Sequence, residues 1–253
     1  MTLAPLTTLS LTSCGPACGE GTVEENGECV ATESDVHGDG DADTDAHGDF
    51  DTDAVFVGVS FVHVSAGWFW MGQPESEVSD FLKHKVSLTH DYYVGETEVT
   101  QGQFEAAMGY NPAYFTDCDS VGPTDCPVEQ VTWHESVAYA NAASEAARLQ
   151  QCYTCTGTGS AVECEVAMNP YECTGYRLLT EAEWEGAARC GIAFTYAGSN
   201  DSADVAWTSE NSDSSTHTVA GLAANTCGLY DMSGNVWEWT QDWYSTSYDS
   251  ALA

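Results

Sequence analysis

Eleven cysteines constrain the fold of this 253-residue chain more than any other feature of its sequence. Several lie close together: Cys18 is near Cys29, Cys118 is near Cys126, and four more lie between residues 152 and 173. A protein in a reducing compartment rarely keeps so many thiols unless they bind a metal. We therefore expect an exported protein in which neighbouring cysteines form disulfides.

The four clustered cysteines, Cys152, Cys155, Cys164 and Cys173, leave two interpretations open. A structural zinc site with four thiolates requires two closely spaced pairs, and Cys152 with Cys155 supplies one of them. The second pair is separated by eight residues instead of two, so the zinc pattern is incomplete. We favour disulfides that close a surface loop, and the sequence does not determine their connectivity.

The first fourteen residues resemble a bacterial export signal. They are uncharged and mildly apolar, and Leu11-Thr12-Ser13-Cys14 resembles the box at which lipoproteins are cleaved and lipidated on the cysteine. No Lys or Arg precedes this box, so the basic part of a signal is missing, and an ordinary chain terminus is the alternative. We predict an outer-membrane lipoprotein anchored at Cys14 or an extracellular protein. No later segment reaches the ~20 apolar residues of a transmembrane helix.

Acidic residues outnumber basic ones by 40 to five, which gives a formal charge of -35. Such a surface repels the phosphates of nucleic acids and anionic membranes. We therefore expect cations, or partners with basic faces, and no nucleic acid. Since the chain is expected to be exported, its partner is expected to be an exported protein or a glycan.

Composition divides the chain into segments. Residues 15–30 form a small cysteine-containing segment, and residues 31–54 hold nine acids, no Lys or Arg and almost nothing apolar. Residues 31–54 cannot bury enough surface to offset the entropy of ordering, so we predict an acidic disordered linker. Its Asp-x-Asp rhythm is not an EF-hand, because a loop starting at Asp39 or Asp41 lacks the required glycine and closing glutamate. Residues 55–253 are expected to form a folded domain.

That domain is expected to be α+β, with few helices and much loop. Residues 55–64 and 84–99 are rich in β-branched and aromatic residues, which predicts strands. Three helix starts share one pattern, in which a threonine is followed three residues later by Gln or Glu. The three pairs are Thr100 with Gln103, Thr132 with Glu135, and Thr180 with Glu183. After residue 191 no helical period remains.

The stretch "GLYDMSGNVWEW", residues 228 to 239, places two acids seven positions apart around a Gly-Asn pair. A hard dication requires several oxygens, and a turn that exposes carbonyls between Asp231 and Glu238 supplies them. The alternative is a tight turn before a strand, in which Asp231 caps the turn and Glu238 is solvated.

Seven blocks of the sequence together resemble the sulfatase-modifying-factor family, whose namesake is the formylglycine-generating enzyme. In order they are "WFWMG", "GETEVTQGQF", "NPAYF", "PVEQVTWHESVAYAN", "GYRLLTEAEWEGAAR", "AWTSENS" and "GLYDMSGNVWEWTQDWY". The similarity extends over residues 58 to 245. It implies an irregular C-type-lectin-like fold that is often stabilised by calcium. Namesake members use copper and oxygen to oxidise a sulfatase cysteine to formylglycine.

The resemblance also implies calcium ligands. They are the side chains of Asp231 and Glu238 and the backbone carbonyls of Gly234 and Val236. The tryptophans of the same stretch, Trp237 and Trp239, are then expected to be packing anchors. A second calcium site of the namesake enzymes begins with an asparagine where this chain has Val205-Ala206, so that site is not expected.

The main departure from the family concerns the redox cysteines. In the family they follow the tryptophan block in a segment rich in glycine and serine, and this sequence ends at Ala253 before such a segment. No cysteine present is assigned a catalytic role, and copper is expected only if a further segment supplies a cysteine pair. The histidines His84, His90 and His134 lack the spacing of an iron-binding triad.

Two smaller departures lie near the third predicted helix. Leu179 stands where the family usually has proline, and Gly186 replaces an aromatic residue at a cost of about 1 kcal/mol. Two functions stay open: an exported, calcium-stabilised domain that is non-catalytic as the sequence stands, or part of a formylglycine-generating oxidase whose redox cysteines lie beyond residue 253.

Overall fold

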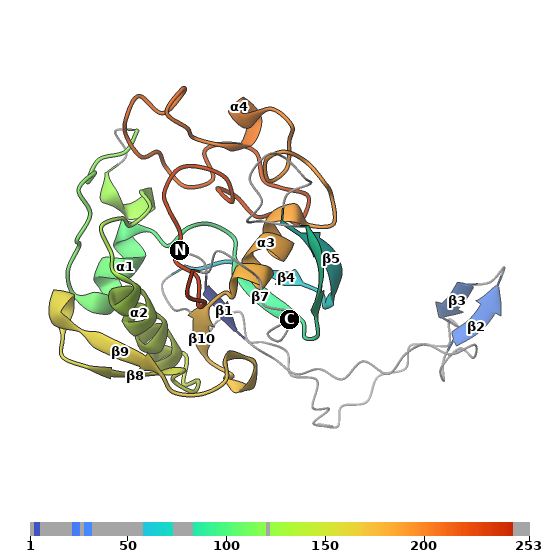
Figure 1. Cartoon of the computed structure of the whole chain (residues 1–253), viewed down its shortest axis with the longest axis horizontal. Helices are drawn as coiled ribbons and strands as arrows, with labels where there is room; N and C mark the ends of the chain where they lie inside the picture. The colour runs from blue at the N-terminus through green and yellow to red at the C-terminus, as the bar shows by residue number, and fades with distance from the viewer. Residues whose placement is uncertain are drawn as a thin grey trace, which may run out of the picture. The chain divides into compact units, whose positions relative to one another are not determined.

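The computed structural model describes residues 58–72, 83–119 and 122–244 with their side chains (Figure 1). Nearer the N-terminus it describes the backbone of three strands, β1 (Leu3–Pro5), β2 (Thr22–Glu25) and β3 (Glu28–Ala31). The chain divides into two units, Leu9–Asp53 and Met1–Thr8 with Ala54–Ala253. In the smaller unit β2 and β3 pair antiparallel. The side chains of Cys14, Cys18 and Cys29 and most of the predicted acidic linker lie outside the described residues.

The larger unit contains short antiparallel strand pairs instead of one broad sheet. Its strands are β4 (Phe61–Val64), β5 (Gly67–Met71), β6 (His84–Leu88), β7 (Tyr92–Gly95), β8 (Tyr153–Thr156), β9 (Glu163–Val166) and β10 (Tyr176–Leu178). β4 pairs with β7, β5 with β6, β8 with β9, and β10 with β1. The predicted strands within residues 55–64 and 84–99 are confirmed as β4, β6 and β7, over shorter spans.

Helices begin where the three threonine patterns predict them. The helices are α1 (Gln101–Met108), α2 (Trp133–Ala146), α3 (Glu181–Arg189) and the short α4 (Ser202–Val205), and single 3-10 turns occur at Pro123–Asp125, Gly159–Ala161 and Pro170–Glu172. At the start of α2, the Thr132 amide donates to Glu135 Oε2 at 2.8 Å and the Glu135 amide donates to Thr132 Oγ1 at 3.2 Å. These reciprocal bonds satisfy amides that a first helical turn leaves unpaired. The same capping box opens α1 and α3.

Helix α2 lies beside the β8–β9 hairpin (Figure 1), and one hydrophobic core includes residues of both. Phe104 of α1 stacks on Tyr139 of α2 with ring centroids 5.7 Å apart, and both side chains are fully buried. Asn141 of α2 donates to the Tyr153 carbonyl of β8 at 2.7 Å. Burial of these large rings and of the aliphatic side chains around them holds α1, α2 and β8 together.

A second core lies between α3 and the β5–β6 hairpin. A Cβ added at Gly186 would lie 3.0 Å from Leu88 Cδ1 and 3.2 Å from Phe69 Cε1. The aromatic residue that the family has at this position therefore has no room here, because the hairpin packs directly on the helix backbone. Leu179 is 1% exposed and lies in this same core.

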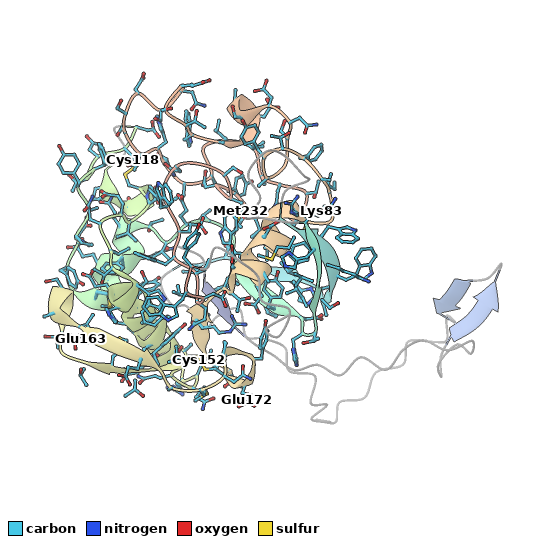
Figure 2. The ribbon with its side chains drawn as sticks, in the orientation of Figure 1. Lys83, Cys118, Cys152, Glu163, Glu172 and Met232 are labelled. Carbon is cyan, nitrogen blue, oxygen red and sulfur yellow. A yellow bond between two sulfur atoms is a disulfide. The ribbon has the colours of Figure 1, made fainter. Side chains whose placement is uncertain are left out.

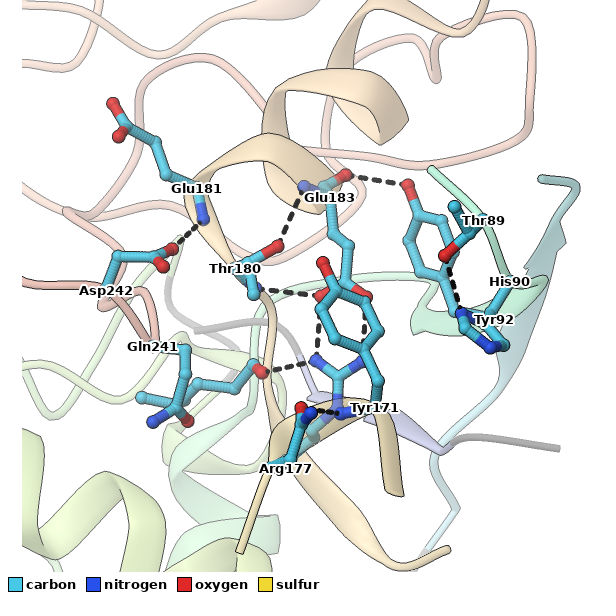
Figure 3. A network of polar contacts seen from close by, with 12 residues as sticks. Thr89, His90, Tyr92, Tyr171, Arg177, Thr180, Glu181, Glu183, Gln241 and Asp242 are labelled. Atoms are coloured by element: carbon cyan, nitrogen blue, oxygen red, sulfur yellow. Dashed lines mark hydrogen bonds and ion pairs between the residues drawn. The ribbon is translucent and has the colours of Figure 1, made fainter. Parts of the chain in front are cut away.

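A buried ion pair joins β10 to α3 (Figure 3). Arg177 Nη1 and Nη2 donate to the two carboxylate oxygens of Glu183, each at 2.7 Å. The side chains are 0% and 3% exposed. Tyr92 of β7 also donates its hydroxyl to the Glu183 carbonyl at 2.7 Å, so β7, β10 and α3 meet at Glu183.

Eight cysteines of the described residues form four disulfides. They are Cys118–Cys126, Cys152–Cys173, Cys155–Cys164 and Cys190–Cys227. The disulfide interpretation of the 152–173 cluster is confirmed, with one bond nested inside the other. The described residues contain no helix of the length and apolarity needed to cross a membrane.

Protein from its native compartment is expected to show few free thiols. Eight of the eleven cysteines are paired, which leaves at most three reactive thiols in denaturant before reduction (11 − 8 = 3); after reduction we expect eleven, or ten where Cys14 carries lipid. Thiol titration with and without reductant measures both numbers. Four or more reactive thiols before reduction would contradict the four disulfides.

Candidate metal centre

The turn formed by residues 228–239 rests against Trp207. Asn235 donates its amide to the Trp207 carbonyl at 2.9 Å. Gly234 has φ +87°, and a Cβ there would lie 2.2 Å from the Trp207 carbonyl oxygen. Asp231 and Asn235 also adopt left-handed φ angles, of 55° and 54°. Such angles are tolerated best by Gly, Asn and Asp, so the residue types "D-x-x-G-N" fit the local backbone.

Asp231 is a buried carboxylate. The residue is 5% exposed, and its Oδ2 accepts a hydrogen bond from the Ala220 amide at 2.7 Å. Burial, followed by the nearby charge of Glu238, raises the pKa of Asp231 above its usual range. The charge of Glu238 therefore acts against the ionisation of Asp231.

Glu98 is a third acid at this site, which the sequence reasoning did not identify. It is 2% exposed; its Oε1 accepts from the Val236 amide at 3.1 Å and its Oε2 from Asn235 Nδ2 at 2.8 Å. Burial and the charges of Asp231 and Glu238 raise its pKa well above the ordinary value. A sequence signal for Glu98 does exist. This residue lies in the block "GETEV", which resembles the family and ends directly before the N-cap of α1.

Glu238 is tied to the third helix. It is half-buried, and its Oε2 accepts a hydrogen bond from Trp184 Nε1 of α3. The alternative in which Glu238 is merely solvated is therefore wrong. Three acids therefore connect the turn to other parts of the domain. Glu98 connects it to the segment before α1, Asp231 to residue 220, and Glu238 to α3.

The polar groups at this turn are carboxylate and carbonyl oxygens. Neither Glu98 nor Asp231 forms an ion pair with a basic side chain within the described residues, so their charges have no protein counterion there. Among those residues, no three His, Cys, Asp or Glu side chains gather closely enough to hold a metal by themselves. A cation here would therefore require backbone carbonyls such as those of Gly234 and Val236. Carboxylate and carbonyl oxygens suit calcium better than copper or zinc.

In calcium-free buffer, the free energy of unfolding is expected to fall as pH rises above about 4. Glu98 and Asp231 have raised pKa values when folded, so between the unfolded-state pKa of a carboxyl, about 4, and the folded value the native state binds more protons. Stability therefore decreases with rising pH across that window. Asp119 and Glu135 have lowered pKa values, so at pH below about 4 their protonation decreases the stability of the native state as pH falls.

Denaturant unfolding in chelator at a series of pH values measures this fall. The variant Glu98→Gln keeps an acceptor oxygen for Val236 but removes a buried charge, so its stability is expected to depend less on pH. An equal pH dependence in the parent and in Glu98→Gln would contradict the raised pKa of Glu98.

The expectation that both tryptophans of the turn are packing anchors is wrong. Trp237 is fully exposed, and Trp239 is 46% exposed with its Nε1 donating to the Val131 carbonyl at 2.9 Å. Indoles from elsewhere support the turn instead. Trp184 donates a hydrogen bond to Glu238. The Trp207 carbonyl accepts a hydrogen bond from the Asn235 backbone amide, and the Trp207 ring stacks on His217 with ring centroids 3.8 Å apart.

The other sequence candidates do not assemble into a site within the described residues. His134 Nδ1 accepts from the Cys164 amide at 3.1 Å, while His90 bonds to Thr89 and stacks on Tyr171 (Figure 3). His84 lies opposite Met71 in the β5–β6 hairpin. Val205 and Ala206, at the place of the second calcium site, are buried apolar residues.

Comparison with known proteins gives a consistent family. The model of the "Sulfatase-modifying factor enzyme 1-like domain" matches residues 46–252. Chaperone protein LppX of Paenibacillus barcinonensis is 35% identical over 203 residues, which are 69% of this chain and 70% of LppX. The solved structure of Treponema denticola variable protein 1 superposes with a TM-score of 0.64 at 33% identity and covers 74% of each chain.

Formylglycine-generating enzymes are also similar, over a shorter span. The enzyme of Streptomyces coelicolor is 32% identical over 145 residues, which are 51% of this chain and 36% of the enzyme. The chain therefore spans about a third of the length of that enzyme, compared with about two thirds of LppX.

Proposed function

Because the chain belongs to the family of sulfatase-modifying factor enzyme 1-like domains, we propose that it is an exported, calcium-stabilised domain that binds a partner and turns over no substrate. The main support is the pair of buried carboxylates, Glu98 and Asp231, which lack a basic partner among the described residues. Burying such charges is costly unless a cation balances them. The family fold itself is an irregular α+β, C-type-lectin-like one.

In this proposal Asp231 and Glu238 bind the cation with their carboxylates, and Gly234 and Val236 bind it with their carbonyls. Glu98 positions the turn by accepting from the Val236 amide. The cation supplies positive charge and joins the turn to α3 through Glu238 and its bond to Trp184. Calcium thereby rigidifies a loop region that has little regular secondary structure of its own.

The rigid turn displays aromatic side chains to a partner. Trp237, Trp243 and Tyr244 are 101%, 96% and 78% exposed; Trp237 lies between the proposed ligands Val236 and Glu238, and the other two lie five and six residues beyond Glu238. Exposed aromatic clusters are typical of binding surfaces, where Trp and Tyr contribute much of the affinity. The similarity to a protein named as a chaperone, over 70% of that protein's length, supports a binding role.

Export is supported by the four disulfides, which persist in oxidising compartments. We extend this proposal to a lipid anchor at Cys14, on the strength of the Leu-Thr-Ser-Cys box.

The second candidate function is a formylglycine-generating oxidase, which the similarity to the Streptomyces coelicolor enzyme favours. Copper would require a pair of thiolates. The eight cysteines of the described residues are all in disulfides, so the pair would come from another segment.

The chain of 253 residues is expected to form no formylglycine from a peptide with a sulfatase-type cysteine, even after copper loading. Mass spectrometry detects the conversion of the peptide thiol to an aldehyde. The formylglycine-generating enzyme of Streptomyces coelicolor is the positive control, and free copper is the blank. Aldehyde formation above the copper blank would overturn the non-catalytic proposal in favour of the oxidase.

A further inference from the structure

The β5–β6 hairpin presents an unusual outer face, which we call the tryptophan–lysine face and define as Trp68, Trp70, Lys83 and Lys85. Alternation along the strands turns Phe69 inward toward α3 and leaves Trp68 and Trp70 60% and 47% exposed. Trp70 lies opposite Lys85 in the register. Lys83, labelled in Figure 2, directly precedes β6. Two indoles on one side of a strand are about 6.6 Å apart along it, so they form adjacent platforms.

The face also concentrates the positive charge of the molecule. Lys83 and Lys85 are the only lysines in a chain with a formal charge of -35. Lys85 Nζ lies 4.2 Å from the Trp68 ring centroid and Lys83 Nζ lies 5.6 Å from that of Trp70. Neither lysine forms an ion pair with a carboxylate within residues 58–72, 83–119 and 122–244.

The remaining basic residues are used differently. Arg177 is buried against Glu183, and Arg189 pairs with Glu185 on α3. Arg148 is exposed just beyond α2, and within the described residues it forms no cation–π contact. The tryptophan–lysine face is therefore the place in the described residues where unpaired positive charge and open aromatic surface occur together. Exposed aromatic patches of this kind mark binding sites.

We propose that the tryptophan–lysine face binds a linear acidic polysaccharide whose sugars carry carboxylates, such as a polyuronate. The sugar carboxylates pair with Lys83 and Lys85, whose ammonium groups lie over the Trp70 and Trp68 rings, and the C–H faces of the pyranose rings contact the parts of the indoles that stay exposed. Both features repeat along such a polymer, so neighbouring sugars meet neighbouring Trp–Lys pairs. Charge-assisted contacts to lysine and contact with indole are each favourable on a half-exposed surface.

Other anionic partners fit this face less well. A planar anionic membrane presents its charge to the acidic surface around the face as well, whereas a single polysaccharide chain contacts the face alone, and salt screens its charge from more distant carboxylates beyond about 8–10 Å. An acidic peptide offers carboxylates to the lysines but no regular flat apolar faces to the two indoles. The proposal rests on the proposed function only in placing the chain outside the cell, and it requires no calcium ligand.

The test is titration of the full chain with short oligomers of polygalacturonate, compared with the same oligomers after methyl esterification. The parent is expected to bind the acidic form at least about tenfold more tightly, because esterification removes the carboxylates. The double variants Trp68→Ala/Trp70→Ala and Lys83→Gln/Lys85→Gln are each expected to weaken binding by about tenfold or more. Melting curves recorded beside each titration establish that the variants are folded.

Matched controls distinguish binding at the tryptophan–lysine face from non-specific binding elsewhere on the protein. Tyr114→Ala removes a 75% exposed aromatic ring elsewhere, and Arg148→Gln removes an exposed charge, so both are expected to leave the affinity unchanged. Equal loss in these controls overturns the proposal. So does tighter binding to polyglutamate or to phosphatidylglycerol vesicles than to the oligomers, or failure to distinguish the acidic from the esterified form. The calcium response of melting is recorded separately, so failure here leaves the metal proposal to its own test.

Discussion

Replacing Glu183 by alanine is expected to destabilise the domain by about 3–5 kcal/mol. Glu183 accepts two hydrogen bonds from Arg177 at 2.7 Å, and both side chains are almost completely buried. Truncation leaves the guanidinium charge inside the core with only the Leu178 carbonyl, at 2.9 Å, as its acceptor. It also removes the capping bond to the Thr180 amide, since Glu183 Oε2 accepts that bond at 2.8 Å. Denaturant unfolding measures the loss.

A second ion pair on α3 provides the matched control. Arg189 and Glu185 are more accessible to solvent, with side chains 28% and 19% exposed, so Arg189→Ala is expected to cost clearly less than Glu183→Ala. The double variant Arg177→Met/Glu183→Leu replaces both buried charges and is expected to recover part of the lost stability. Equal losses in Glu183→Ala and Arg189→Ala would show that the buried pair has no special importance.

The helices were predictable because their start signals are local. Each capping box depends on residues three positions apart, and the signals at Thr100, Thr132 and Thr180 placed the helix starts correctly. Pairing over longer separations was not predictable. The Cys190–Cys227 disulfide spans 37 residues, and neither cysteine has a neighbour in sequence that indicates its partner.

The same distinction between local signals and long-range contacts applies to the residues of the candidate site. Asp231 and Glu238 belong to one turn, so a short stretch of sequence identified them. Glu98 meets that turn from 138 residues away, as its bond to the Val236 amide shows, and no local pattern reports such an approach. The error at Trp237 has a related cause: residue type indicates burial, but Trp184 and Trp207 from other segments take the positions beside the turn.

Calcium is expected to raise the melting temperature of the full chain by several degrees. A ligand that binds only the native state stabilises it by RT ln(1 + [L]/Kd), which is ~2.7 kcal/mol at a hundred times Kd and about 5–10 °C for a domain of this size. We expect the cation to offset the burial of these carboxylates and the repulsion from Glu238, which together raise the pKa values of Glu98 and Asp231. Magnesium is expected to substitute poorly, because it requires tighter octahedral geometry.

The full chain is the right object for this test. β1 (Leu3–Pro5) pairs with β10, so deleting the N-terminal segment would remove a strand together with the acidic residues 31–54. Those acids are present in the parent and in every variant, and loose calcium binding to them therefore cancels in the comparison. Glu163→Ala serves as the matched control, because it removes an exposed carboxylate of β9 that is not part of the turn.

The most direct test of the account is the calcium-induced shift in melting temperature of the parent, Asp231→Ala, Glu238→Ala and Glu163→Ala, each compared in chelator and in millimolar calcium. We predict a rise of several degrees in the parent and in Glu163→Ala, and a rise less than half as large in Asp231→Ala and Glu238→Ala. Equal melting of the parent in chelator and in calcium, or equal shifts in all four proteins, would contradict a calcium site at residues 231–238.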